Sequence, residues 1–212
     1  MRKPRDREDT RERALQAAEK IFAEHGFAGT SLAMIAQESG LSDGLILHHF
    51  QSKGNLYHQV LDGLAMRYAS VLQEAQAASA GPAEALRQVL AASFNFWKQD
   101  TTYNRISLWA YLEQQGDFSE KETAITARLA QGIAELQEKG AIDRRYTPVM
   151  FLNTIIGSMH FWVRYRESFK TALALSQPLD ELDQRFLDQL IGLTREMSRP
   201  ASDVSDLEGK HP

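Results

Sequence analysis

Residues 27–50 contain the stretch that decides the fold: Phe27-Ala28-Gly29-Thr30-Ser31-Leu32-Ala33-Met34-Ile35-Ala36, followed by Gly40-Leu41-Ser42 and His48-His49-Phe50. The apolar positions 32, 35 and 36 have helical spacing, and Thr30 or Ser31 can cap the start of this helix. Gly40 interrupts the pattern, and Ser42 can cap a second short helix that ends near His49. Two short helices joined by a glycine-containing turn predict a helix-turn-helix unit.

The second helix of such a unit must be short and exposed to enter the major groove of DNA, while the first helix crosses the backbone. We expect a small apolar core to fix the angle between the two helices, formed by Leu32, Ile35, Ala36, Leu41, Ile46 and Phe50. The groove would then face the remaining positions of the second helix: Ser42, Asp43, Gly44, Leu45, Leu47, His48 and His49.

With Ser52 and Lys53 included, this stretch resembles the head of the TetR family of bacterial transcriptional regulators, over roughly residues 9–60. The resemblance implies that Thr30 and Ser31 place a hydroxyl and a helix N-terminus against a phosphate. It also implies that Lys53 touches the DNA backbone and that the basic segment from Arg2 to Arg7 reaches a minor groove. The expected DNA-binding residues are Thr30, Ser31, Ser42, Asp43, Gly44, Leu45, Leu47, His48, His49 and Lys53, with the helix-turn-helix from about Ser31 to Phe50.

The recognition segment departs from the family pattern at three positions, Asp43, Leu45 and Leu47. A leucine can contact a thymine methyl group but cannot donate a hydrogen bond to phosphate, and an aspartate near phosphate repels it. These departures support the alternative function, a dimeric helical ligand carrier or interaction protein that has lost DNA binding. The main prediction is a sequence-specific DNA-binding regulator, a repressor that a small-molecule effector releases from a palindromic operator.

Helical patterns continue to the C-terminal region, and no segment shows the strict alternation of a half-buried strand. About nine helices are expected, over residues 9–25, 32–39, 42–49, 52–80, 82–99, 102–115, 119–140, 147–170 and 179–198. The predicted fold is therefore all-α, with a three-helix helix-turn-helix head over residues 1–55. Residues 56–200 would form a helical ligand-binding and dimerisation bundle, and residues 201–212 a disordered tail.

The body contains candidates for a dimer interface and for a ligand site. A single recognition helix reads too few base pairs for genomic selectivity, so a homodimer is expected. The last two helices supply the candidate interface: Phe151, Ile155, Met159, Trp162, Phe186, Leu190, Leu193 and Met197. Aromatic residues beside isolated polar groups are typical of small-molecule pockets. The candidate ligand residues are Phe94, Trp97, Tyr103, Arg105, Trp109, Asn153, His160 and Arg164, and ordinary core packing is the alternative for both sets.

Composition excludes several classes of protein. The 212 residues contain no Cys, so disulfides, thiolate metal sites and cysteine nucleophiles are impossible, and a cytoplasmic location is expected. No phosphate-binding glycine loop or metalloprotease motif occurs, so we expect neither an enzyme nor a cofactor or metal. The uncharged stretch 146–163 contains polar residues and is shorter than the roughly 20 apolar residues that cross a bilayer, so no membrane span is expected.

Overall fold

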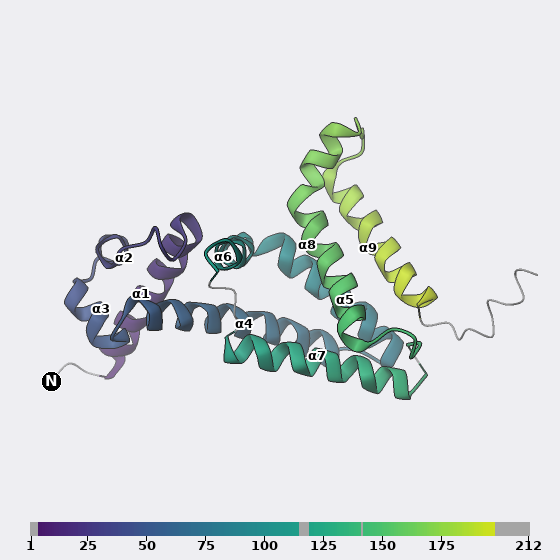
Figure 1. Cartoon of the computed structure of the whole chain (residues 1–212), viewed down its shortest axis with the longest axis horizontal. Coiled ribbons are helices and arrows are strands. Elements are labelled where there is room, and N and C mark those ends of the chain that lie inside the picture. Colours follow the sequence, from purple (N-terminus) through teal and green to yellow (C-terminus); the bar gives the residue numbers. More distant parts are fainter. Residues whose placement is uncertain (1–3, 115–118, 141, 198–212) are drawn as a thin grey trace, which may run out of the picture. The chain divides into compact units, whose positions relative to one another are not determined.

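The computed structural model describes residues 4–114, 119–140 and 142–197, and all regular structure in these ranges is helical (Figure 1). This confirms the expected all-α fold. In chain order the helices are α1 (Pro4–His25), α2 (Leu32–Ser39), α3 (Asp43–Phe50), α4 (Lys53–Ala77), α5 (Pro82–Gln99), α6 (Thr101–Leu112), α7 (Glu120–Glu138), α8 (Pro148–Ala172) and α9 (Leu179–Glu196).

The largest difference from the expected helix boundaries lies at the N-terminus. Helix α1 begins at Pro4 rather than near Asp9, because proline fits the first turn of a helix and no glycine interrupts the charged residues that follow. The C-terminal part of the expected basic arm, Pro4 to Arg7, is therefore helical. Arg2 and Lys3, and the expected tail over residues 201–212, lie outside the described residues.

The chain divides into two compact units that are not consecutive in sequence. The first, which we call the head unit, contains residues 1–69 and 99–124, and the second, the body unit, contains residues 70–98 and 125–212. This division differs from the expected domains because α6 packs against α1. Helix α6 therefore belongs to the unit that carries the helix-turn-helix.

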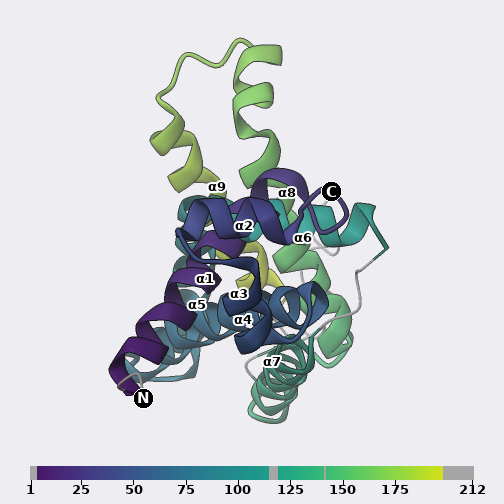
Figure 2. The same ribbon diagram turned by 90° about the vertical axis from the view of Figure 1, so that its left-hand side faces the viewer.

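In the head unit, α1 packs against α2 and α3, and α3 lies in front of this arrangement in Figure 2. Phe22 is fully buried and meets the ring of Tyr57 from α4 edge-on, with 4.9 Å between the ring centroids. Ile35 of α2 and Ile46 of α3 are also buried. The core thus joins all of the first four helices, which fixes the angle between α2 and α3.

Side chains form hydrogen bonds with several backbone N–H and carbonyl groups of the turn between α1 and α2. The Nζ of Lys53 donates to the carbonyl oxygens of Phe27 and Thr30, both at 2.8 Å, and lies 4.3 Å from the centroid of the Phe27 ring. On the other side, the carboxylate of Glu113 accepts from the backbone N–H groups of Phe27 at 2.8 Å and Ala28 at 3.1 Å. Because unpaired buried backbone groups are costly, these contacts hold the turn in one conformation.

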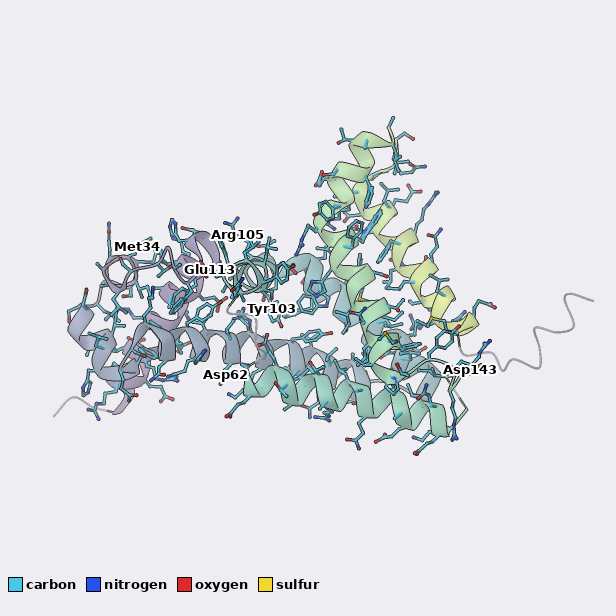
Figure 3. All side chains as sticks on the ribbon, viewed as in Figure 1. Met34, Asp62, Tyr103, Arg105, Glu113 and Asp143 are labelled. Carbon is cyan, nitrogen blue, oxygen red and sulfur yellow. The ribbon has the colours of Figure 1, made fainter. Side chains whose placement is uncertain are left out.

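Helix α6 is attached to α1 at a second place. The carbonyl oxygen of Ala23, near the end of α1, accepts from Nε of Arg105 at 2.7 Å and from Nε1 of Trp109 at 3.3 Å. Figure 3 labels Arg105, which lies on α6, and Glu113, which is the residue that ends α6. Gly26 adopts a φ of 71°, and a Cβ atom there would overlap the Glu113 carboxylate, so glycine is required.

The body unit contains a buried carboxylate with three partners. The side chain of Asp183 on α9 is 2% exposed and accepts from Nε1 of Trp162 at 2.9 Å and from the guanidinium of Arg166, both on α8. The Nζ of Lys98 on α5 lies 3.5 Å away. Removing one partner from such a buried pair is strongly destabilising. Asp183 therefore joins α5, α8 and α9.

Aromatic rings fill the space between the same helices. The rings of Trp162 and Phe186 are stacked with centroids 5.0 Å apart, and Phe186 also meets Phe94 at 5.5 Å. The ring of His160 packs on Trp97 at 4.1 Å. Burial, with a smaller contribution from the charge of Arg164, lowers the pKa of His160 to about 4. The folded protein therefore favours the neutral imidazole.

We predict that the body unit loses stability in mild acid through His160. In the unfolded chain His160 takes up a proton near pH 6.5, whereas in the folded protein it does so only near pH 4. The contribution of neutral His160 to the free energy of unfolding is therefore fully present above about pH 6.5 and declines below it. Through this group the free energy of unfolding should fall by about 2 to 3 kcal/mol between pH 7 and pH 4.5. Urea unfolding at the two pH values measures it. Between the two pH values, the free energy of unfolding of His160→Phe should fall less than that of wild type, and the difference should equal this contribution. His58→Phe, at an exposed histidine, should lose as much as wild type.

We also predict that Lys53 stabilises the head unit. Lys53→Met removes the donor for two turn carbonyls and should lower the free energy of unfolding by about 2 kcal/mol. Lys139→Met changes net charge equally at an exposed position and should have no measurable effect on urea unfolding. Equal stability of Lys53→Met and wild type would contradict the structural role of the Lys53 ammonium.

Candidate nucleic-acid interface

Helices α2 and α3 are each begun by a serine. The hydroxyl oxygen of Ser31 accepts from the backbone N–H of Met34, and that of Ser42 accepts from the N–H of Leu45, both at 3.3 Å. Between the helices, Gly40 adopts a φ of 66° and ends α2 in the left-handed conformation. Local sequence therefore sets the length and separation of both helices.

Helix α3 presents one face to its own unit and the opposite face to solvent. Ile46 and Phe50 are buried, as expected, whereas Asp43, Gly44, Leu47 and His48 are exposed, and Leu45 and His49 are intermediate. An added Cβ at Gly44 would meet no atom within 4 Å, so packing within this chain does not require glycine there. The exposed face of α3 is available for the major groove, and its contacts with bases remain predictions.

The structure corrects the expected role of Thr30. The side chain is buried, at 3% exposure for the residue, and its hydroxyl donates to the carbonyl oxygen of Gly26 at 2.6 Å. It therefore stabilises the turn before α2 and is not presented to a phosphate. Ser31 is exposed at the start of α2, in a position suited to the expected contact. The ammonium of Lys53 is directed to the turn, so its expected phosphate contact stays a prediction beside a structural role.

Positive charge is scarce on the two helices of the motif. Residues 31–52 contain no Lys or Arg, and they contain Glu38 and Asp43. Lys20 of α1 pairs with Glu38 at 2.7 Å and so neutralises one of the two acids. His48 and His49 are adjacent on α3, with ring centroids 5.6 Å apart. Cationic contacts to DNA must therefore come largely from other helices.

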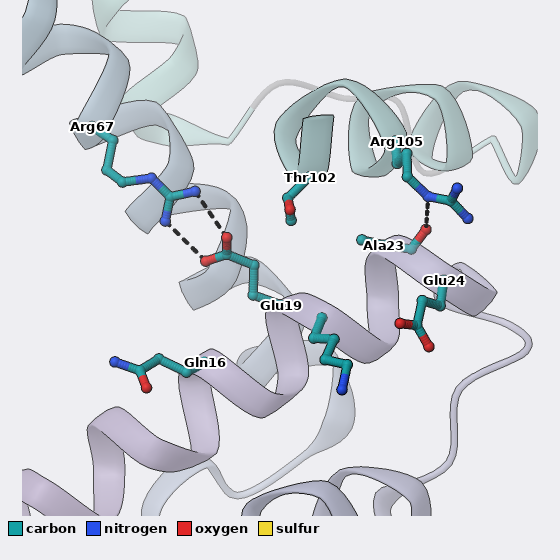
Figure 4. Close-up of a pocket in the computed structure, with 8 residues that line it drawn as sticks. Gln16, Glu19, Ala23, Glu24, Arg67, Thr102 and Arg105 are labelled. Atoms are coloured by element: carbon teal, nitrogen blue, oxygen red, sulfur yellow. Dashed lines mark hydrogen bonds and ion pairs between the residues drawn. The ribbon is translucent and has the colours of Figure 1, made fainter. Parts of the chain in front are cut away.

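A polar cavity of about 460 Å³ lies in the head unit between α1, α4 and α6 (Figure 4). Arg67 of α4 forms two hydrogen bonds with the carboxylate of Glu19, at 2.8 and 2.9 Å, and also pairs with Asp100, the N-cap of α6. Of the charged groups that line this cavity, Glu19 and Arg67 bind each other, and Arg105 donates to the carbonyl oxygen of Ala23. They attach α6 to α1 and α4. The lining residues are Gln16, Glu19, Lys20, Ala23, Glu24, Arg67, Thr102 and Arg105.

The eight expected ligand residues divide between the two units. Tyr103, Arg105 and Trp109 belong to the head unit, where Arg105 and Trp109 bind the carbonyl of Ala23 and only Arg105 lines the described cavity. Phe94, Trp97 and His160 pack within the aromatic cluster of the body unit. Asn153 and Arg164, expected on the same face as His160, are exposed on α8. No comparison tests ligand binding, so these assignments stay predictions.

The eight expected interface residues also separate by burial. Phe151, Ile155, Met159 and Leu190 are buried within the chain itself, and Trp162 and Phe186 stack on each other. This arrangement agrees with the alternative of ordinary core packing for those six. Leu193 is exposed at 58%, and Met197 is intermediate. The exposed apolar positions of α8 belong to a different face, which includes Phe161 and Tyr165.

Sequence reasoning missed Arg67 and Glu113, which hold the head unit together, and Asp183, which joins three helices of the body unit. Each binds a partner on another helix, and Glu113 is 86 residues from Phe27, so no local spacing indicates the contact. Within the described ranges, no group of three or more His, Asp or Glu residues could hold a metal ion. None of the helices described is both long and apolar enough to span a bilayer.

Comparison with known proteins agrees with this geometry. Residues 14–60 match the family described as "Bacterial regulatory proteins, tetR family". The HTH-type transcriptional regulator TtgR of Pseudomonas putida is 27% identical over 175 residues, which cover 76% of this chain and 83% of that protein. The HTH-type transcriptional repressor AcnR of Corynebacterium glutamicum is 36% identical over 66 residues, which cover 31% of this chain and 35% of AcnR.

The fold is also similar to a solved structure. A putative transcriptional regulator, SCO4942 from Streptomyces coelicolor, superimposes with a TM-score of 0.70 at 24% identity, covering 89% of this chain and 97% of that one. The matched segment contains α2, α3 and the start of α4, the elements that form the interface described above. The helix-turn-helix segment of this chain thus matches the TetR family over residues 14–60, and the whole chain is similar to helix-turn-helix transcriptional regulators.

Proposed function

We propose that this protein is a dimeric repressor that binds a palindromic operator through α3 and leaves it when a small molecule binds. The observation that supports the proposal most directly is the solvent-facing surface of α3, which is capped at its start by Ser42 and held at its end by the buried Phe50. AcnR, which matches the head of this chain, is itself named a repressor. Two such helices would bind half-sites about 34 Å apart.

The proposed dimer interface lies on the exposed face of α8 with the neighbouring part of α9. Met150, Phe161 and Tyr165 are apolar side chains exposed at 61%, 57% and 40%, and Gly157 lies between them at helical spacing. Leu193 of α9 is also exposed, at 58%. Large exposed apolar patches mark interaction sites in proteins of this size. This surface replaces the expected one, most of whose residues face the interior of the chain.

The proposed effector response acts through α6. This helix follows α5 of the body unit directly in the chain, yet its own side chains bind α1 and the turn before α2. A ligand that favours a different position of α6 would therefore favour a different position of α1 and α2. Such a shift needs only a few kcal/mol of differential affinity to reduce operator binding substantially. The effector site itself is expected in the body unit, near the cluster of Phe94, Trp97 and His160.

Selection of bound duplexes from random DNA tests the proposed function. The full chain should enrich one palindromic sequence with half-sites about one helical turn apart. Compounds that bind the protein, found by thermal shift, should include at least one that lowers its affinity for this duplex. Failure to enrich any duplex at low ionic strength would contradict operator binding and favour the carrier alternative. An operator without two-fold symmetry would contradict the dimer.

We predict that Phe161→Glu separates the dimer. A carboxylate placed on each side of an apolar interface would be buried without a partner, so light scattering should report a monomer. Operator affinity should then fall by roughly 100-fold or more, because the second recognition helix is no longer tethered. Met66→Glu, at a 51% exposed residue of α4 in the head unit, is the matched control and should remain dimeric. A dimeric Phe161→Glu protein would refute this interface.

A further inference from the structure

Binding to the DNA backbone requires cations, and the motif itself supplies few. Residues 31–52 contain no Lys or Arg, and the Lys53 ammonium already binds two carbonyl oxygens and the Phe27 ring. Each phosphate neutralised by a Lys or Arg contributes to affinity through counterion release. Arginines of α1 are therefore the next source to consider.

Arg11 of α1 is held at the junction between α3 and α4. Its guanidinium carbon lies 5.7 Å from the centroid of the Phe50 ring, at the last residue of α3. Its Nη2 also donates to Oε1 of Gln59 on α4. Figure 2 shows the N-terminal half of α1 beside these two helices. The side chain is exposed, and among the described residues its other N–H groups have no hydrogen-bond partner.

The neighbouring cations of α1 differ from Arg11 in their partners. Arg13 donates to the carbonyl oxygen of Ser39 at 2.7 Å and so caps the end of α2, and Lys20 is paired with Glu38. Arg7 lies one turn before Arg11, on the same face of α1, and is exposed. A guanidinium that is fixed at one edge and open at the other suits two hydrogen bonds to a phosphate.

We propose that Arg11 binds a DNA backbone phosphate beside the major groove that α3 occupies, with Arg7 adding positive charge on the same face. This assignment rests on the proposed function, because it needs α3 in the groove. The ring of Phe50 and the amide of Gln59 position the guanidinium. The ring contact also couples Arg11 to the last turn of the recognition helix, so that the phosphate contact and the orientation of α3 support each other.

The salt dependence of operator affinity tests the proposal. Affinity for the selected duplex is measured by fluorescence anisotropy from 50 to 300 mM salt, with wild type and Arg11→Gln. The slope of log K against log salt should decrease in magnitude by about one per protomer, or about two for a dimer on its operator. Affinity for duplexes with altered bases should weaken in the same proportion, because a phosphate contact carries no base information.

Two further variants separate this role from a purely structural one. Arg11→Lys keeps the charge and should retain most of the slope, whereas Arg128→Gln, at an exposed arginine of α7, should leave slope and affinity unchanged. If Arg11→Gln binds more weakly with the wild-type slope, Arg11 only supports α3 and the proposal is overturned. An unchanged affinity overturns it as well. A wild-type protein without affinity for any duplex would overturn operator binding itself, which is a different result.

Discussion

The backbone of the turn between α1 and α2 is the constraint on which the head depends. Side chains of distant residues pair with its N–H groups and carbonyls, and each such hydrogen bond favours one conformation of the turn. Glu113 accepts from the N–H groups of Phe27 and Ala28, and Lys53 donates to the carbonyls of Phe27 and Thr30. The start of α2, and through it the angle of α3, therefore depends on residues of α4 and on the residue that ends α6.

Helix α6 is the second element on which the geometry of the head unit depends. Helix α6 is held to the other helices of the head unit by three kinds of interaction: the ion pair of Arg67 with its N-cap Asp100, the two donors to Ala23, and the Glu113 carboxylate. Helix α6 follows α5 directly in the chain, and these contacts attach α6 to α1, to α4 and to the turn before α2 within the head unit.

The sequence predicted the features that depend on local spacing. Serine caps, Gly40 and the apolar positions 35, 46 and 50 all lie within a few residues of the helices they specify, and the structure confirms them. Features set by distant contacts were not predictable. The burial of Thr30 follows from its bond to Gly26, and the orientation of α8 follows from the pairing of Asp183 with Arg166. Periodicity identified the apolar face of α8 but could not show that it packs within the same subunit.

Amide hydrogen exchange at Phe27 and Ala28 tests most directly whether Glu113, the residue that ends α6, holds the turn before α2 in place. Both amides should exchange slowly in the wild-type protein and lose protection in Glu113→Ala, with the loss extending into α2 but not into α9. Fast exchange of both amides in wild type, or equal protection in Glu113→Ala, would show that the turn is held by something else and would contradict the role assigned to α6.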